Sequence, residues 1–154
     1  MTLNIGRPAP DFTLTDQHGQ QVTLSSMHGA KSVVVWFYPF AFSGICTGEL
    51  GAIRDDMQTF HNDDVELLAL SCDHMFSLRA YADRDGLDFP LLSDFWPHGE
   101  VSRSYEVFDE QAGAATRGTF LVDRVGLLRW RVVNPIGVAR DLDDLRRALT
   151  DLQT

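Results

Sequence analysis

The stretch SVVVWFYPFAFSGIC, residues 32 to 46, predicts a buried strand, a tight turn and the start of a helix. Its first seven residues form an apolar run rich in valine and aromatic side chains, which is typical of a strand buried in a sheet covered on both faces. The turn that follows begins with Pro39, which fixes the exit of the strand, and contains Gly44, which lets the chain close tightly. Beyond it, apolar residues recur every three or four positions, the spacing of an amphipathic helix: Leu50, Ile53, Met57 and Phe60. We therefore expect a strand over residues 31–38 and a helix from residue 46 to about residue 62.

A second apolar run, Val65 to Cys72, follows the expected helix. A strand, a helix of at least three turns and a strand in this order form a βαβ unit, whose two strands lie parallel and side by side with a right-handed crossover. The carboxyl ends of parallel neighbours lie at one edge of a sheet. We therefore expect Cys72 to lie at the same edge as Cys46, one strand over.

The rest of the chain supplies further strands and helices around this unit. We expect a hairpin of Asp11–Asp16 with Gln21–Leu24, a short connector or helical turn over Ser25–Ala30, a helix over Phe76–Asp85 closed by Gly86, a short strand or extended loop over Phe89–Asp94, a short helix over Glu100–Val107, a hairpin of Gly118–Asp123 with Leu127–Val133, and an amphipathic helix over Asp141–Leu152. This order predicts an α/β fold of thioredoxin-like layout, with an N-terminal β-hairpin and inserted elements, in a single domain over residues 1–154.

Bulk properties exclude several function classes. The 154 residues carry a net charge of −9 at pH 7, which would repel a phosphate backbone or an acidic membrane, so we expect neither a nucleic-acid nor a membrane partner. The first residues, Met1 to Pro8, show no charged leader followed by an apolar core, and no apolar run approaches the roughly 20 residues of a membrane helix. Two cysteines without an export signal are typically reduced. These observations favour a cytoplasmic location.

Cys46 is the candidate reactive residue. It lies in the first turn of the expected helix, where backbone N–H groups are unpaired and the helix dipole is positive, and both favour the thiolate, the form of cysteine that attacks. Ser43 is a good N-cap whose hydroxyl could bond a backbone N–H near Cys46. The competing interpretation is a small, buried and inert cysteine. Its place after a buried strand, at the edge where open α/β sheets bind ligands, favours the reactive interpretation.

The pattern Pro39-x-x-x-Ser43-x-x-Cys46 resembles the active-site motif of the peroxiredoxin family. Further matches extend over nearly the whole chain: GRPAPDFTL at residues 6–14, FYP before the site, Glu49 three residues after the cysteine, and RGTFLVD at residues 117–123. The segments ICTGEL and LLSDFWPHG, at residues 45–50 and 91–99, most resemble the one-cysteine members of that family.

The resemblance implies a thiol peroxidase of peroxiredoxin type. Cys46 would attack hydrogen peroxide or an organic hydroperoxide and become a sulfenic acid, while the Ser43 hydroxyl would bind the peroxide and Arg117 would stabilise the thiolate and the transition state. Pro39 would shield the site from water, and Glu49 would orient Arg117. The family more commonly has threonine at position 43. Serine keeps the hydroxyl but loses the methyl group that restricts rotation about χ1.

Cys72 bears on how the sulfenic acid at Cys46 would be reduced. It could resolve the sulfenic acid by forming a disulfide with Cys46, or it could simply fill the core. A disulfide needs Cα atoms within about 7 Å and facing Cβ vectors, which two separate elements need not provide. The resolving positions of two-cysteine relatives are empty, with Gly51 at one of them. We predict a one-cysteine mechanism with an external thiol reductant, which the resemblance identifies as a low-molecular-weight thiol with a glutaredoxin-like protein, or as thioredoxin.

Large aromatic side chains lie on loops that the expected fold places near Cys46. These are Phe95 and Trp96, next to Pro97, together with Phe40 and Phe42. They could fill the core beneath those loops, form a dimer contact beside the site as in many peroxiredoxins, or make an apolar mouth for organic hydroperoxides. We expect a homodimer or a higher homo-oligomer.

Other sites and functions have weaker support. We interpret Arg140, a second arginine, as a solvated surface charge. His61, Cys72 and His74 offer only fragments of a zinc site, so we expect no metal, and without a glycine-rich phosphate loop we expect no cofactor. Two other functions stay open. One is a redox sensor or binding module that signals through oxidation of Cys46, and the other is a thiol–disulfide exchange protein, which the absence of a paired C-x-x-C disfavours.

Overall fold

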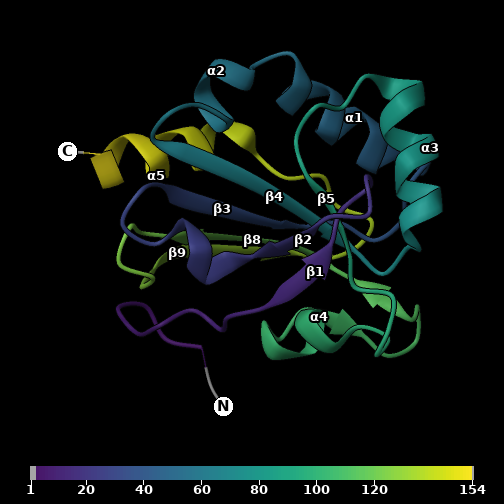
Figure 1. Cartoon of the computed structure of the whole chain (residues 1–154), viewed down its shortest axis with the longest axis horizontal. Helices are drawn as coiled ribbons and strands as arrows, with labels where there is room; N and C mark the ends of the chain where they lie inside the picture. Colours follow the sequence, from purple (N-terminus) through teal and green to yellow (C-terminus); the bar gives the residue numbers. More distant parts are fainter. Residues whose placement is uncertain (1–2, 154) are drawn as a thin grey trace.

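The computed structural model describes residues 3 to 153, and it places seven strands of that range in one mixed sheet (Figure 1). The order of these strands across the sheet is β2-β1-β5-β4-β3-β8-β9. Their bounds are β1 (Thr13–Thr15), β2 (Gln21–Thr23), β3 (Ser32–Phe37), β4 (Val65–Ser71), β5 (Leu91–Ser93), β8 (Arg117–Val122) and β9 (Leu128–Asn134). β3, β4 and β5 run parallel to one another, whereas β8 runs antiparallel to β3.

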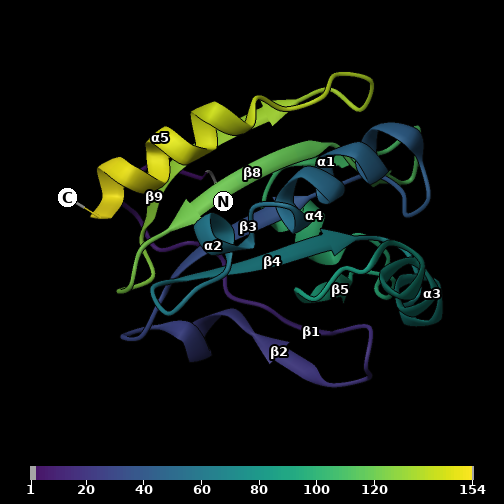
Figure 2. The same ribbon diagram turned by 90° about the horizontal axis from the view of Figure 1, so that it is seen from above.

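Helices cover both faces of this sheet. The helical elements are η1 (Leu24–Met27), α1 (Gly44–Arg54), α2 (Met57–Phe60), α3 (Met75–Asp85), α4 (Glu100–Ser104) and α5 (Leu142–Gln153). Figure 1 shows α1, α2, α3 and α5 on one face, and α4 with the N-terminal segment on the other. Seen from above in Figure 2, α5 lies over β8 and β9, while α3 lies beside β5. No helix in the described part of the chain is long and apolar enough to cross a membrane.

β3 is the centre of the core, as its sequence predicts. All six of its residues are buried. Val34 and Trp36 pack in the apolar cluster beneath α1, α3 and α5, whereas Val33, Val35 and Phe37 pack in the cluster beneath α4 and η1. A strand that contributes to two cores has no solvated face, which is why its residues show no alternation of polar and apolar side chains.

The expected pairings are confirmed. β3 and β4 are parallel neighbours from Ser32 opposite Val65 to Phe37 opposite Leu70, as a βαβ unit requires. β1 with β2 and β8 with β9 form the two antiparallel hairpins. Gly86 ends α3 in the left-handed conformation, with φ of 65°. The result is the α/β, thioredoxin-like layout that the order of the elements predicts, with the N-terminal hairpin added at one edge of the sheet.

The single helix expected from residue 46 to about residue 62 is wrong. α1 ends at Arg54, and Asp56 adopts the non-helical angles φ −134° and ψ 44° before the short helix α2. Aspartate is a poor helix former because its carboxylate competes for nearby hydrogen-bond donors. Here the Asp56 carboxylate accepts from Thr59 Oγ1 at 2.9 Å and from Arg146 Nε at 3.1 Å. The break lets Phe60 reach the same core as α1.

A small ribbon of β6 (Phe108–Asp109) and β7 (Ala114–Ala115) also lies outside the sequence-based expectation. Strands of two residues are too short to show a period in the sequence. The sequence between α4 and β8 therefore shows no pattern that would predict these two strands.

Candidate active site

Three elements meet at the carboxyl end of β3. α1 begins at Gly44, directly after the turn that leaves β3, and puts Cys46 in its first turn with no solvent exposure. β8 is antiparallel to β3, with Trp36 opposite Thr119, so the start of β8 lies beside the end of β3. Arg117 is the first residue of β8. The antiparallel pairing of β3 with β8 therefore brings together Cys46 and Arg117, which stand 71 positions apart in the chain.

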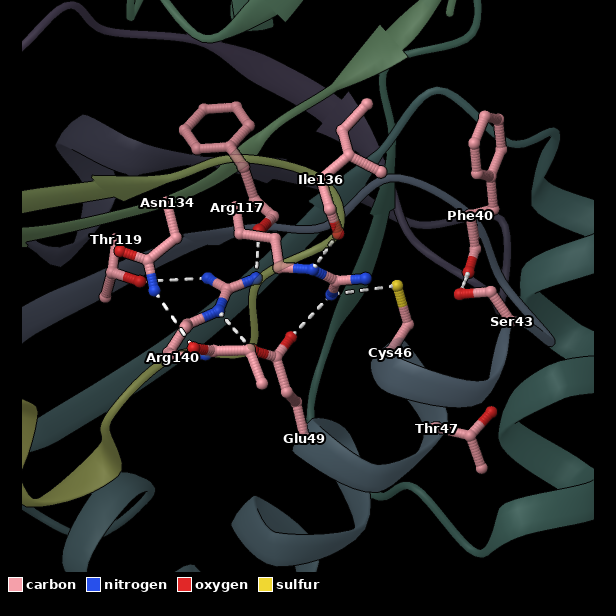
Figure 3. Close-up of polar contacts among 12 residues, drawn as sticks. Phe40, Ser43, Cys46, Thr47, Glu49, Arg117, Thr119, Asn134, Ile136 and Arg140 are labelled. Atoms are coloured by element: carbon pink, nitrogen blue, oxygen red, sulfur yellow. Dashed lines mark hydrogen bonds and ion pairs between the residues drawn. The ribbon is translucent and has the colours of Figure 1, made fainter.

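Arg117 connects the thiol to a carboxylate (Figure 3). Its Nη1 lies 3.2 Å from Cys46 Sγ and 2.7 Å from Glu49 Oε1, and its Nε donates to the Ile136 carbonyl at 2.6 Å. The guanidinium is almost completely buried, so these partners fix its orientation. A buried cation that donates a hydrogen bond to sulfur favours the thiolate over the thiol.

Arg140 is not a surface charge, and that expectation is wrong. The residue is buried, and its Nε and backbone N–H donate to Glu49 Oε2 at 3.2 and 2.8 Å. Its other nitrogens donate to Thr119 Oγ1 and to the Gly118 and Phe37 carbonyls, and its guanidinium stacks 3.6 Å from the centre of the Trp36 ring. Burial lowers the pKa of Arg140 to about 10, against the opposing effect of Glu49, so it stays charged at neutral pH.

Glu49 stands between the two arginines, with one carboxylate oxygen on each. Its side chain is nearly as buried as theirs. Two buried cations and one buried anion leave one positive charge without a fixed counter-charge. An unbalanced charge is costly in a buried site, and Cys46 Sγ lies 3.2 Å from Arg117 Nη1, at the position where an anion would balance it.

The turn between β3 and α1 holds Pro39 and Ser43. Pro39 is buried and Ser43 is half-buried. Ser43 is the N-cap of α1, as expected, but its hydroxyl makes no capping bond to a helix N–H. It donates instead to the Phe40 carbonyl at 3.0 Å (Figure 3), because the turn folds that carbonyl back toward Ser43. The expected bond to a backbone N–H near Cys46 is therefore wrong.

Cys72 follows the end of β4, as expected, but its side chain belongs to the opposite face of the sheet. Its Sγ lies 4.0 Å from Ser102 Oγ of α4, whereas Cys46 packs in the cluster under α1 and α3. Both thiols are free. Burial, followed by the charge of Asp94, raises the pKa of Cys72 to about 11, so it is a neutral thiol at neutral pH.

The aromatic side chains near the site do not fill the core. Phe40 and Phe42 are 42% and 44% exposed, Phe95 is 44% exposed and Trp96 is 81% exposed. Of the three interpretations drawn from the sequence, core filling is wrong, and an apolar contact surface or an apolar mouth remains. In the part of the chain that the structure describes, no group of three or more His, Cys, Asp or Glu side chains is placed to hold a metal ion.

Sequence reasoning underrated Arg140 because nothing in its neighbours marks it. The available signal was topological. β9 ends opposite the start of β8, with Asn134 opposite Arg117, so the loop that follows β9 must return along the edge where Cys46 lies. An arginine on such a loop has buried carboxylates and carbonyls within reach.

Comparison with known proteins agrees with this geometry. The model of the AhpC/TSA family matches residues 5–131. The chain is 52% identical to alkyl hydroperoxide reductase E of Mycobacterium tuberculosis over 90% of this chain and 91% of that protein, and 37% identical to a putative peroxiredoxin of Synechocystis over 96% and 77%. The crystal structure of Enterococcus faecalis AhpC covers 99% of this chain and 93% of its own, with a TM-score of 0.89 and 27% identity.

Three observations agree on the family of this chain. They are the thioredoxin-like fold, the buried Cys46 thiol beside Arg117, and the family model that matches most of the chain. The 52% identity to alkyl hydroperoxide reductase E agrees with the family resemblance found in the sequence. The chain belongs to the AhpC/TSA family and is a peroxiredoxin, an oxidoreductase of the thiol peroxidase class.

Proposed function

We propose that this chain reduces hydrogen peroxide and organic hydroperoxides by a one-cysteine mechanism centred on Cys46. The observation that carries the proposal is the 3.2 Å contact between Arg117 Nη1 and Cys46 Sγ, in a buried cluster that keeps one positive charge unbalanced. Such a cluster holds the sulfur as a thiolate and supplies donors for charge that develops on a peroxide oxygen.

The chemical step follows from these groups. The Cys46 thiolate attacks one peroxide oxygen with its electron pair, a sulfur–oxygen bond forms and the O–O bond breaks. The second oxygen leaves as hydroxide or alkoxide and takes a proton, and Cys46 becomes a sulfenic acid. Arg117 stabilises the thiolate and the departing charge, and Ser43 holds the peroxide in line. Pro39 limits water access, and Glu49 fixes Arg117 through its Oε1 contact.

An external thiol completes the cycle. It attacks the sulfenic sulfur, water leaves, and a second thiol then releases Cys46 as the thiolate. Support for an external donor is that Cys72 packs against Ser102 on the other face of the sheet, so an internal disulfide would require local unfolding. The reductant in the proposal is a low-molecular-weight thiol with a glutaredoxin-like protein, or thioredoxin.

Disulfide mapping tests the one-cysteine mechanism. The pure protein is treated with one equivalent of hydrogen peroxide, digested without reduction and analysed by mass spectrometry. We expect a sulfenic acid at Cys46, trapped by dimedone, and an unmodified Cys72. A bridge between Cys46 and Cys72 within one chain would contradict the mechanism.

Turnover separates an enzyme from a redox sensor. With dithiothreitol in excess, we expect the protein to consume hydrogen peroxide in many-fold molar excess over itself, and the Cys46→Ser variant to consume none above background. Consumption of one equivalent and no more would favour a sensor that signals through Cys46 oxidation.

We also propose that the chain forms a homodimer, or a higher homo-oligomer, through the exposed aromatic side chains beside the active site. The His74 ring contacts the rings of Phe76 and Phe95, which are 67% and 44% exposed, and Trp96, next to Phe95 in the chain, is 81% exposed. Monomeric proteins rarely leave a contiguous aromatic patch in water. The net charge of −9 argues against nucleic acid and acidic membranes as partners.

A cytoplasmic location is part of the proposal as well. It is supported by two thiols that are free in the folded chain, which suits a reducing compartment. Fractionation of the source cells, followed by detection of the protein, tests this location.

A further inference from the structure

One peptide unit links the active-site turn to β4. The Phe40 carbonyl accepts the hydroxyl of Ser43 at 3.0 Å, and the next atom along the same peptide bond, the Ala41 nitrogen, donates to Asp73 Oδ2 at 2.8 Å. A peptide unit is planar and trans, so its C=O and N–H point in opposite directions and rotate together. Holding the Ala41 N–H therefore fixes the direction of the Phe40 carbonyl that holds Ser43.

Asp73 is itself firmly anchored. Its Oδ2 also accepts the hydroxyl of Ser71 at 2.7 Å, and its carbonyl accepts the hydroxyl of Ser93 at 2.6 Å. These contacts fasten the residue to the carboxyl ends of β4 and β5. Asp73 is thus a rigid acceptor at the same edge of the sheet as Cys46.

The turn needs such an anchor because its conformation is strained. Phe42 has φ of 70°, a region that residues with a side chain rarely adopt. Its ring packs against Tyr81, with ring centres 4.9 Å apart, and under Arg84 at 4.8 Å. Strained backbone of this kind persists only where surrounding contacts over-determine it.

We propose that Asp73 is a positioning residue for peroxide reduction, acting through the Phe40–Ala41 peptide on the hydroxyl of Ser43. With its hydrogen on the Phe40 carbonyl, Ser43 presents its lone pairs to the O–H that every hydroperoxide carries, while Arg117 supplies donors on the other side. Asp73 thereby sets the angle at which the peroxide meets Cys46. This inference rests on the proposed function, because it assigns Ser43 a peroxide to bind.

The test uses stopped-flow fluorescence to measure the second-order rate constant for the oxidation of Cys46 by hydrogen peroxide in four variants. We expect Asp73→Ala and Ser43→Ala each to lower the rate about tenfold, since a slightly misplaced substrate loses that much or more. In the double variant we expect no more than the larger single loss, because both changes disable the same hydroxyl. Asp73→Asn keeps an acceptor oxygen for Ala41 and Ser71, so we expect it to stay within about threefold of wild type.

Two further measurements separate positioning from general damage. The thiolate absorbance near 240 nm at pH 7 should be unchanged in Asp73→Ala, because Arg117 and Glu49 are untouched. Asp123→Ala is the matched control, since the Asp123 carboxylate, like that of Asp73, accepts two hydrogen bonds in a turn, but at the far end of β8; its donors are the backbone N–H groups of Val125 and Leu127. We expect its peroxide rate to equal that of wild type. If Asp73→Ala does not fold, Asp73→Glu keeps the charge and displaces the acceptor, and it should slow the reaction severalfold.

The outcomes are distinguishable. A wild-type protein that does not react with peroxide overturns the proposed function. A reactive wild type with an unaffected Asp73→Ala variant, or with Asp73→Glu as fast as wild type where Asp73→Ala does not fold, overturns the role of Asp73 alone. So does a double variant in which the two losses multiply to about a hundredfold, since independent effects add in free energy.

Discussion

At the scale of single residues, the site depends on a shared carboxylate between two buried arginines. Glu49 gives one oxygen to Arg117 and the other to Arg140, and only Arg117 touches the sulfur. The two arginines therefore have different positions relative to the thiol. Arg117 contacts the sulfur, whereas Arg140 binds Glu49 and three carbonyl or hydroxyl groups of β3 and β8.

Replacing Arg140 by methionine tests how much this residue contributes to the free energy of unfolding. The change leaves the Glu49 carboxylate without one of its two cations, and removing one partner of a buried pair costs about 3 to 5 kcal/mol of unfolding free energy. Urea unfolding followed by far-UV circular dichroism measures the loss. Arg124→Met is the control, because Arg124 forms an exposed pair with Asp64 that contributes about 1 kcal/mol or less. Equal losses in the two variants would contradict a buried role for Arg140.

Cys72 gives a second residue-scale prediction, on pH. A pKa of about 11 leaves roughly one Cys72 thiol in a thousand ionised at pH 8. The rate of its alkylation by iodoacetamide should rise about tenfold per pH unit between pH 8 and pH 10, because only the thiolate reacts. Mass spectrometry of the labelled native Cys46→Ser variant measures this directly. A labelling rate that is flat over this interval would contradict the prediction.

The predictability of these residues follows from their separation in the chain. Pro39, Ser43 and Cys46 lie within eight positions, so a local pattern identified them. Arg140 lies 91 positions from Glu49, and its burial depends on β3, β8 and the return of the chain after β9. Local sequence shows none of this. The hydrogen-bond partner of the Ser43 hydroxyl could not be predicted from the sequence either, because it is set by the conformation of the turn and not by its composition.

At the scale of elements, the packing of β8 against the segment after α4 keeps Arg117 in position. Gly118 follows Arg117, and a Cβ at this position would lie 2.7 Å from Val107 Cγ1 and 3.0 Å from Phe120 Cε2. Contacts that close force the strand or its neighbours to move. The strand that carries Arg117 therefore requires glycine at its second residue.

Gly118→Ala tests this requirement. We expect the variant to lose about 1 to 3 kcal/mol of unfolding free energy from overpacking, and to react more slowly with peroxide because Arg117 shifts from Cys46. Gly137→Ala is a suitable control, since no atom outside its neighbours lies within 4 Å of the added carbon. A Gly118→Ala variant as stable and as fast as the control would show that β8 can adapt.

Element boundaries show where sequence periodicity stops being informative. The apolar spacing from Leu50 to Phe60 continues across the break at Asp56, because both helices bury residues in one core. A break between two helices that keeps the apolar spacing of three and four residues leaves no trace in the periodicity of the sequence. The adjacent pair Asp55-Asp56 was the available signal, since both residues disfavour a helix interior.

At the scale of the whole molecule, the parallel pair at the centre of the sheet and the two-sided core follow from the buried runs in β3 and β4. Those runs predicted the parallel pair and the edge of the sheet at which the site lies, whereas the pairing of β3 with β8 and of β1 with β5 joins strands far apart in the chain. The ribbon of β6 and β7 was not predicted, because strands of two residues are too short to show a period in the sequence. The exposed aromatic patch is the feature of the whole molecule that the isolated chain leaves unexplained.

Trp96→Glu tests the proposed homo-oligomer. Light scattering after size-exclusion chromatography at micromolar concentration should give at least twice the chain mass of 17.3 kDa for wild type. We expect a smaller mass for the variant, because a charge in the middle of an apolar contact opposes association. Val125→Glu is the control, with a 72% exposed side chain in the turn after β8. A monomeric wild type would contradict the proposal.

Stopped-flow tryptophan fluorescence with hydrogen peroxide and an organic hydroperoxide tests most directly whether Cys46 is the residue that peroxide oxidises. Trp36 is fully buried beneath Arg140, in the same core as Cys46, and reports on that cluster. We expect a signal whose rate is proportional to peroxide concentration in wild type and in Cys72→Ser, and no such signal in Cys46→Ser. Unchanged oxidation kinetics in Cys46→Ser would contradict it.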